Sequence, residues 1–353
     1  MNTIDLPYPR SCAAVDHGDA PELLTMRDGT RVTDAATWAR RRVELADAII
    51  GAEYGGMPPA LDPSATTVEM ISESDASRSI GVGWSRKRCY RVTVYGGAIP
   101  LVFGLELWLP RQSDKPFPVI LNGDGCWSYA SDAVIAEIVK RGFAFAIFNR
   151  CDMARDCYGT RDRDIYVAFP GEYGALSAWA WTYHRAYDAL LRIPEADPAR
   201  VAITGHSRGG KTVELAAATD GRIAACGDNN SGCGGFASYR VVGEGSERIA
   251  DITRLASYWF ADGFASWAGR ESELPFDQSF LSALIAPRPL MFAVAHGDAW
   301  SNPPGTCQTY REVTEVYDML GAGDKFSIVF REGAHGHLID DWVRFVEFAS
   351  RSM

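Results

Sequence analysis

The sequence lacks the patterns that mark metalloproteins, membrane proteins and repeat proteins. None of its eight cysteines stands in a Cys-x-x-Cys pair, and no cysteine–histidine cluster has the spacing of a metal site. No run approaches the ~18–20 apolar residues of a membrane span, and there is no repeat or low-complexity tract. We therefore expect neither a metal nor a membrane partner. The even number of cysteines permits disulfides, but we expect most cysteines to be small, buried apolar residues.

Positive charge is scarce as well. The net charge of -10 argues against a nucleic-acid or anionic-membrane surface, so an anionic substrate would depend on locally placed cations. The first residues lack a basic region followed by an apolar one and do not look like a signal peptide. This predicts a cytoplasmic protein if Met1 is the natural start. A secreted or periplasmic protein trimmed of its leader would show the same pattern.

What the sequence does contain is the alternation of an α/β protein. We expect a single domain overall, with an N-terminal segment (1–60) whose helix packs on the main body and a catalytic domain (61–353). Residues 88–110 alternate around a Gly-Gly turn and predict an antiparallel hairpin. From residue 117 on, short apolar strands alternate with helices, which predicts a mostly parallel sheet covered on both faces. A hairpin that leads into such a three-layer αβα sandwich is the architecture of the α/β-hydrolase fold.

The segment VAITGHSRGGKTVEL, which begins at Val201, carries the first chemical signal. GHSRG (205–209) fits the G-x-S-x-G pattern of a nucleophile elbow and lies between a predicted strand and a predicted helix. Small residues permit a turn tight enough to project the Ser207 hydroxyl from the sheet edge, and the N-terminus of the helix favours developing negative charge. The alternative is a Gly-rich turn with a capping serine, which the strand and helix context disfavours.

A serine nucleophile needs a general base, and the base needs an orienting acid. In this fold they follow the serine in the order Asp or Glu, then His. His335, flanked by glycines after the last predicted strand, is the preferred base, and His337 is the weaker candidate, either structural or facing solvent. Asp298, directly after a strand, is the preferred acid, and Asp228, after the preceding strand, is its rival.

With these residues placed, the chain resembles the glucuronoyl esterases of carbohydrate esterase family 15, particularly their bacterial branch. The resemblance covers most of residues 24–350. It implies a hydrolase that cleaves esters between 4-O-methyl-glucuronic acid on xylan and lignin alcohols. The matching segments are GHSRGGK (205–211), NNSGCGG (229–235), LPFDQSFLSALIAPRPL (274–290), GDAW (297–300) and REGAH followed by DDW (331–342).

The resemblance also implies roles for individual residues. It makes Ser207 the nucleophile and His335 the base, with Arg208 stabilising the oxyanion. A fixed cation beside the nucleophile makes independent sense, because it lowers the energy of a tetrahedral oxyanion in a partly dry cleft. The substrate-binding residues that it implies are Lys211, Trp300 and Glu247, the last aligned across a small insertion.

Two features depart from the family pattern. Many members, notably fungal ones, carry the catalytic Glu where this chain has Asn230, and an amide cannot be the anionic partner of an imidazolium, so the acid falls to Asp298, as in the bacterial branch. The lack of a secretion signal favours small imported uronate esters over a polymer. The residues alone leave open that Lys211 is a solvated helix residue, Trp300 a core aromatic and Arg208 a surface ion-pair residue.

The leading hypothesis is therefore a serine carboxylic-ester hydrolase acting on glucuronic acid esters through a glucuronoyl-enzyme, without a metal or organic cofactor. Its partner would be a small-molecule or oligosaccharide uronate ester. An acetyl or other acyl esterase acting on sugar hydroxyls would use the same triad. A catalytically silent sugar-binding protein on a hydrolase scaffold also stays open, because of Asn230.

Overall fold

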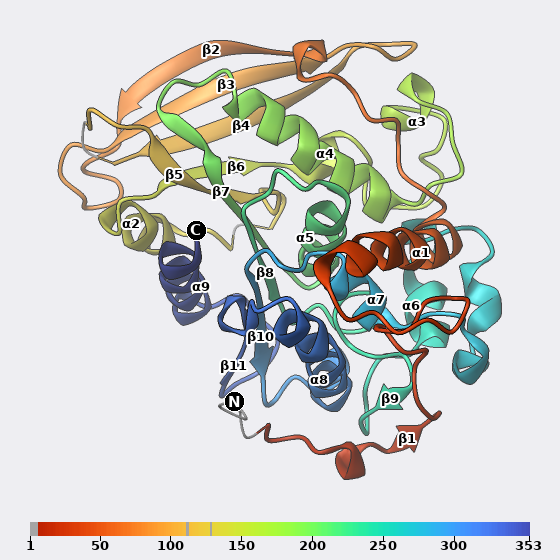
Figure 1. The fold of residues 1–353 in the computed structure, drawn as a ribbon. Coiled ribbons are helices and arrows are strands. Elements are labelled where there is room, and N and C mark those ends of the chain that lie inside the picture. Colours follow the sequence, from red (N-terminus) through yellow and green to blue (C-terminus); the bar gives the residue numbers. More distant parts are fainter. Residues whose placement is uncertain (1–5, 111–112, 128) are drawn as a thin grey trace.

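A nine-stranded sheet runs through the computed structural model, which describes residues 6–110, 113–127 and 129–353 (Figure 1). From β11 to β6 the neighbouring strands are parallel. The pairs β6–β4, β4–β3 and β3–β2 are antiparallel. In sheet order the strands are β11 (Phe326–Arg331), β10 (Leu290–Ala295), β8 (Ala225–Asn229), β7 (Ala196–His206), β5 (Phe117–Asn122), β6 (Ala144–Phe148), β4 (Leu101–Leu109), β3 (Arg86–Val94) and β2 (Thr66–Asp75).

Helices cover both faces of the parallel part, because its strands are apolar on both sides. Val119 and Leu121 of β5 join one buried cluster, whereas Ile120 between them joins the other. Helices α4, α5 and α8 pack on the first face, and α2 and α9 pack on the second. The predicted three-layer α/β-hydrolase sandwich is confirmed. The helices are α1 (Ala35–Tyr54), α2 (Asp132–Lys140), α3 (Ile165–Ala168), α4 (Ala175–Leu190), α5 (Arg208–Thr219), α6 (Ile249–Ala256), α7 (Gln278–Ala283), α8 (Pro303–Met319) and α9 (Ile339–Ser352).

The antiparallel end of the sheet contains a strand that the sequence pattern does not reveal. The predicted hairpin within 88–110 is confirmed as β3 and β4, which pair in continuous register. The edge strand β2 was not predicted, because most of its side chains are exposed and it has no alternating apolar face. It is held by its ladder with β3, which shifts register between Met70 and Ser72.

The N-terminal helix α1 is delimited by local signals in the sequence. The Asp34 carboxylate caps the first turn by accepting from the Thr37 N–H at 2.8 Å, and the helix ends at Gly55, whose φ is 73°. Its buried residues include Trp38 and Ile49, and the helix packs against α7. The domain boundary at residue 60 stays a prediction.

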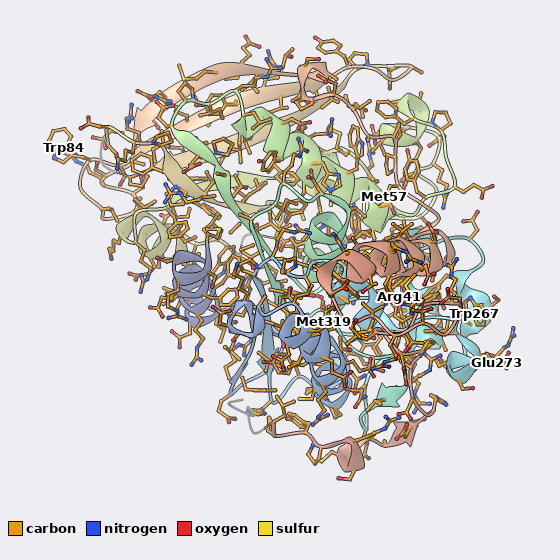
Figure 2. The ribbon with its side chains drawn as sticks, in the orientation of Figure 1. Arg41, Met57, Trp84, Trp267, Glu273 and Met319 are labelled. Atoms are coloured by element: carbon orange, nitrogen blue, oxygen red, sulfur yellow. The ribbon has the colours of Figure 1, made fainter. Side chains whose placement is uncertain are left out.

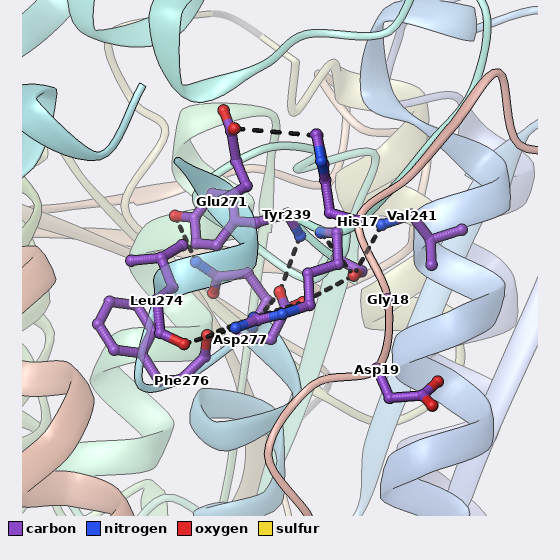
Figure 3. A network of polar contacts seen from close by, with 12 residues as sticks. His17, Gly18, Asp19, Tyr239, Val241, Glu271, Leu274, Phe276 and Asp277 are labelled. Atoms are coloured by element: carbon purple, nitrogen blue, oxygen red, sulfur yellow. Dashed lines mark hydrogen bonds and ion pairs between the residues drawn. The ribbon is translucent and has the colours of Figure 1, made fainter. Parts of the chain in front are cut away.

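The segment before this helix is tied to the main body. The short strand β1 (Val15–Asp16) pairs antiparallel with β9 (Val241–Val242), and the His17 N–H donates to the Arg240 carbonyl at 2.9 Å. Figure 3 shows His17 beside Tyr239 and Asp277 in a network of polar contacts. The buried Arg240 guanidinium pairs with Asp277 at 3.4 Å. Residues 14–17 are thereby held against residues 240–242.

The cysteines differ from the expectation of mostly buried residues. All eight are free thiols, but only three are buried, two are partly buried and three are exposed. In order, these are Cys226, Cys233 and Cys307, then Cys89 and Cys151, then Cys12, Cys126 and Cys157. The expectation is wrong because Cys12, Cys126, Cys151 and Cys157 lie on loops or short 3-10 turns, and Cys89 lies on a partly exposed part of β3. No helix in the described ranges has the length and apolar character to cross a membrane.

Candidate active site

Ser207 occupies the sharp turn between β7 and α5. Its φ of 58° and ψ of −122° are costly for a residue with a Cβ, by about 1–3 kcal/mol. The Ser207 N–H donates to the Asn229 carbonyl at 2.9 Å, and a Cβ at Gly205 would collide with the backbone of Gly209. The Ser207 side chain makes no hydrogen bond that caps α5. The arrangement is that of a nucleophile elbow, and not that of a capping serine.

A buried ion pair lies directly beneath the turn. Asp124, which follows β5, accepts from the His206 N–H at 3.0 Å and pairs with Arg150. Burial raises the pKa of Asp124, and the charge of Arg150 opposes that shift. A Cβ at Gly209 would collide with the Asp124 carboxylate, so packing requires glycine there. This pair could not be predicted from the sequence, because its two members follow different strands and belong to no recognisable motif.

His335 and Asp298 meet at the carboxyl end of the sheet. Their strands, β11 and β10, are parallel neighbours, so the loops that follow them leave the same edge. The Asp298 carboxylate lies 2.6 Å from His335 Nδ1 and is buried. Although burial opposes ionisation, the hydrogen bond and charge of His335 hold the pKa of Asp298 below its ordinary value. Asp298 thus remains an anion that can fix the tautomer of His335 and stabilise its imidazolium.

Two other histidines near this edge, His337 and His206, are unsuited to act as the base. His337 is buried and stacks on Trp342 at 4.1 Å between ring centroids, and burial holds its pKa well below the ordinary value. His206 packs against His335, with ring centroids 4.4 Å apart, and its Nδ1 lies 2.6 Å from the Asn229 amide oxygen. Burial lowers the pKa of His206 to about 4. Both are expected to stay neutral packing residues.

The rival acid, Asp228, points away from His335. It is buried beside Glu214, and its carboxylate accepts from the Ser231 hydroxyl at 2.6 Å. Asn230 instead joins the end of β10 to the loop that contains His335. Its amide oxygen accepts from the Ala295 N–H at 2.8 Å, and its amide nitrogen lies 3.5 Å from the Gly336 carbonyl. Asn230 therefore has a backbone partner in both segments, although it carries no charge.

The buried Asp228 predicts that the protein loses stability as pH rises from about 4 to about 8. Burial raises the pKa of Asp228 to about 8, whereas an unfolded Asp has a pKa of about 4. The stability that this protonated carboxyl contributes is fully present below the unfolded value and is lost as pH rises through the folded one. We expect Asp228→Asn to reduce the fall of Tm between pH 5 and pH 9 by about 2–5 °C. Parallel Tm profiles for wild type and Asp228→Asn would contradict this, and Asp262→Asn, an exposed carboxylate, is the control.

A cavity of about 470 Å³ opens over the elbow. Its wall contains six of the seven residues that the sequence singled out, and the seventh, Asp298, lies behind His335. The aromatic-rich region 236–286, which contains α6, supplies much of the opposite wall. The predicted residues at the cavity are Ser207, Arg208, Lys211, Glu247, Trp300 and His335. In the part of the chain that the structure describes, no group of His, Cys, Asp and Glu has the geometry of a metal site.

Lys211 and Glu247 are polar lining residues of this cavity, and Trp300 is an aromatic one. Lys211 is only 3% exposed, with its ammonium hydrogen-bonded to the Ser231 carbonyl and 3.9 Å from the Glu247 carboxylate. The Glu247 N–H donates to the Trp300 carbonyl at 3.0 Å, and the Trp300 side chain is 44% exposed. Lys211 is therefore not a solvated helix residue, and Trp300 is not a core aromatic.

Arg208 is held by two tryptophans that the sequence analysis did not identify. The guanidinium carbon lies 4.7 Å from the ring of Trp127 and 4.7 Å from that of Trp259. The side chain is 30% exposed and borders the cavity, so Arg208 lines the candidate site, although it also pairs with Asp156. Trp127 and Trp259 come from separate segments of the chain, so only the fold brings both rings to Arg208.

Comparisons with known proteins agree with this geometry. The family model described as glucuronyl esterase of fungi matches residues 92–321. A carbohydrate esterase of an unknown prokaryotic organism is 29% identical over 94% of this chain and 89% of its own length. A 4-O-methyl-glucuronoyl methylesterase of Podospora anserina is 30% identical over 86% of this chain and 60% of its own length. The glucuronoyl esterase structure from Solibacter usitatus superposes with a TM-score of 0.85 at 28% identity, covering 96% of this chain and 99% of that one.

Proposed function

This chain belongs to the glucuronoyl esterase family, and from that premise we propose that it hydrolyses esters of glucuronic acid and its 4-O-methyl ether. One observation carries the proposal: Ser207 and an Asp298-bound His335 border a single cavity that also contains two cations, Arg208 and Lys211. A hydrolase that acts on the carboxyl carbon of a sugar needs the nucleophile and the sugar-binding groups on the same cavity. The Podospora relative is named a methylesterase of this sugar acid.

In the acylation step, the Ser207 oxygen attacks the C6 carbonyl carbon of the uronate ester. Because His335 Nδ1 is bound to Asp298, Nε2 is the nitrogen that takes the serine proton. The carbonyl oxygen becomes an oxyanion, which the Arg208 guanidinium stabilises from the cavity wall. Collapse of the tetrahedral intermediate breaks the ester bond, and His335 returns the proton to the departing alcohol.

In the deacylation step, water hydrolyses the glucuronoyl-enzyme. The His335 side chain is 41% exposed, so water can reach its Nε2 and give up a proton as it attacks the acyl carbon. Collapse of this second intermediate releases the free uronic acid and restores the Ser207 hydroxyl. Lys211 and Glu247 are suited to hydrogen-bond the sugar hydroxyls, since both line the cavity and lie 3.9 Å from each other. The cytoplasmic location, and with it a preference for small imported esters, stays a prediction.

The proposal is tested by incubating the protein with methyl and benzyl glucuronate and, in parallel, with an acetylated xylooligosaccharide. We expect release of methanol and benzyl alcohol well above that of Ser207→Ala, and slower deacetylation. Hydrolysis of the glucuronates no faster than by Ser207→Ala would refute the proposal. Faster deacetylation than glucuronate hydrolysis would assign the triad to esters on sugar hydroxyls instead.

Trp300 predicts a separable effect on substrate binding. A sugar ring stacked on its half-exposed indole would lose about 1–2 kcal/mol in Trp300→Ala, which raises KM about 5- to 30-fold with kcat changed less. The matched control is Trp84→Ala, because Trp84 is 76% exposed and projects from the far margin of the molecule in Figure 2. An unchanged KM in Trp300→Ala would remove the indole from the sugar site.

A further inference from the structure

The Arg208 guanidinium forms an ion pair with Asp156. Asp156 belongs to none of the sequence motifs and has no role in the proposed mechanism. Arg208 Nη1 donates to Asp156 Oδ2 at 2.6 Å. Asp156 lies in the loop that precedes α3, remote in sequence from the elbow. With its carbon 4.7 Å from the ring centroids of both Trp127 and Trp259 and its Nη1 bound to Asp156, the guanidinium is restrained in position and direction.

The Asp156 carboxylate is itself held by three side chains. Its Oδ1 accepts from the Tyr258 hydroxyl at 2.7 Å and from Trp259 Nε1 at 2.9 Å, while Oδ2 accepts from Arg208. Burial alone would oppose ionisation, but the Arg208 charge and these hydrogen bonds hold the pKa of Asp156 below its ordinary value. Charge-assisted hydrogen bonds of this kind are about twice as strong as neutral ones. Trp259 therefore contacts the guanidinium through its ring and the carboxylate through its N–H.

A carboxylate next to an oxyanion stabiliser has two opposite effects. Its negative charge weakens the positive potential that Arg208 projects into the cavity, which would slow the reaction. Its hydrogen bond removes much of the rotamer freedom of a long, flexible side chain. A preorganised donor needs no rearrangement when the oxyanion forms, and this is where most of its effect arises. The two effects make opposite predictions for a neutral replacement of Asp156.

We propose that Asp156 is a positioning residue that holds Arg208 in the orientation needed to bind the oxyanion, an inference that rests on the role proposed for Arg208. With Nη1 bound to Asp156, the remaining guanidinium N–H groups are available to the cavity that Arg208 lines. Tyr258 and Trp259, which line the same cavity, keep the carboxylate in place. The orientation of Arg208 in the cavity thus depends on Asp156, which does not itself line the cavity.

The test is Asp156→Asn, assayed for kcat and KM on methyl glucuronate and for the rate constant of Ser207 labelling by a fluorophosphonate. We expect kcat to fall about 10- to 100-fold with KM nearly unchanged, and labelling to slow as well, because it passes through a similar oxyanion. Asp156→Glu should recover part of the loss. In an Arg208→Ala background, Asp156→Asn should have little further effect, which a general loss of structure would not reproduce. Asp262→Asn, an exposed carboxylate paired with Arg161, is the control.

Each outcome decides one of the two claims. An equal or higher kcat and labelling rate in Asp156→Asn, with an active wild type, overturns the positioning role. Slower labelling in Asp156→Asn, with a wild type that does not hydrolyse glucuronates, supports the positioning role and refutes the proposed substrate. Tyr258→Phe covers the case in which Asp156→Asn does not fold. It removes only one hydrogen bond to the carboxylate, and kcat should fall about 3- to 10-fold, the equivalent of roughly 1 kcal/mol; an unchanged kcat would then overturn the proposal.

Discussion

Substitution of Ser207 by alanine is expected to lower kcat for methyl glucuronate roughly 10⁶-fold, the loss that removal of a triad serine causes. Alanine has no oxygen to attack the ester carbon, so no tetrahedral intermediate forms for His335 and Arg208 to stabilise. KM should change little, since the sugar-binding side chains are untouched. The rate is measured with purified enzyme at high concentration, because residual activity near the uncatalysed rate must be resolved.

Two controls separate lost chemistry from lost folding. Ser207 has a positive φ of 58°, so Ser207→Gly removes backbone strain while it also removes the nucleophile. We expect this variant to be inactive, unlabelled by a fluorophosphonate, and at least as stable as wild type in thermal unfolding. Ser266→Ala, at an exposed serine, should keep full activity. Activity in Ser207→Ala within tenfold of wild type would exclude Ser207 as the nucleophile.

The parts of the fold that the sequence predicts are those in which local pattern and final packing agree. Apolar strands between capped helices predicted the parallel layers, because strands buried on both faces must be apolar throughout. The elbow was predictable for the same reason, since Gly205, Ser207 and Gly209 satisfy one local turn. The positions of His335 and Asp298 could be predicted because the loops that follow two neighbouring parallel strands leave the same edge of the sheet.

The residues that the sequence did not reveal act through contacts between distant loops. Asp156 and Trp127 lie in separate irregular segments, and only the folded chain brings both to Arg208. The burial of Lys211 could not be predicted either, because a lysine in the first turn of a helix is more often solvated. Strand β2 was not predicted because it is held by its hydrogen-bonded ladder with β3 and has no apolar face.

Asn230 stands where many fungal members of the family carry the catalytic Glu, and Asp298, at the same edge of the sheet, is the acid proposed instead. Asn230 lies on the loop after β8, and its amide bonds to the backbone at Ala295, the last residue of β10, and at Gly336 in the loop of His335. A neutral side chain can make these two contacts without placing a second negative charge beside Asp298. The anion that orients His335 is then supplied from β10, one strand closer to the histidine loop.

Replacing Asp298 by asparagine is therefore expected to reduce kcat about 10⁴-fold, as loss of the anionic member of a triad does. An amide at 2.6 Å from His335 Nδ1 can donate as well as accept, so it can select the tautomer with the proton on Nε2. That tautomer cannot take the proton of Ser207, and the imidazolium loses its counter-ion. KM for methyl glucuronate should change much less, because Asp298 lies behind His335 and does not line the cavity.

The comparison with Asp228→Asn makes this prediction specific. Both substitutions replace a buried carboxyl group near the carboxyl end of a strand, Asp228 within β8 and Asp298 after β10, but Asp228 lies beside Glu214 and Ser231 and makes no contact with His335 in the described structure. We expect Asp228→Asn to keep kcat within tenfold of wild type while it weakens the fall of Tm with rising pH. The opposite result, in which Asp228→Asn loses activity and Asp298→Asn retains it, would transfer the acid to β8. Equal Tm values at pH 6 for wild type and Asp298→Asn would show that the loss arises in the reaction and not in folding.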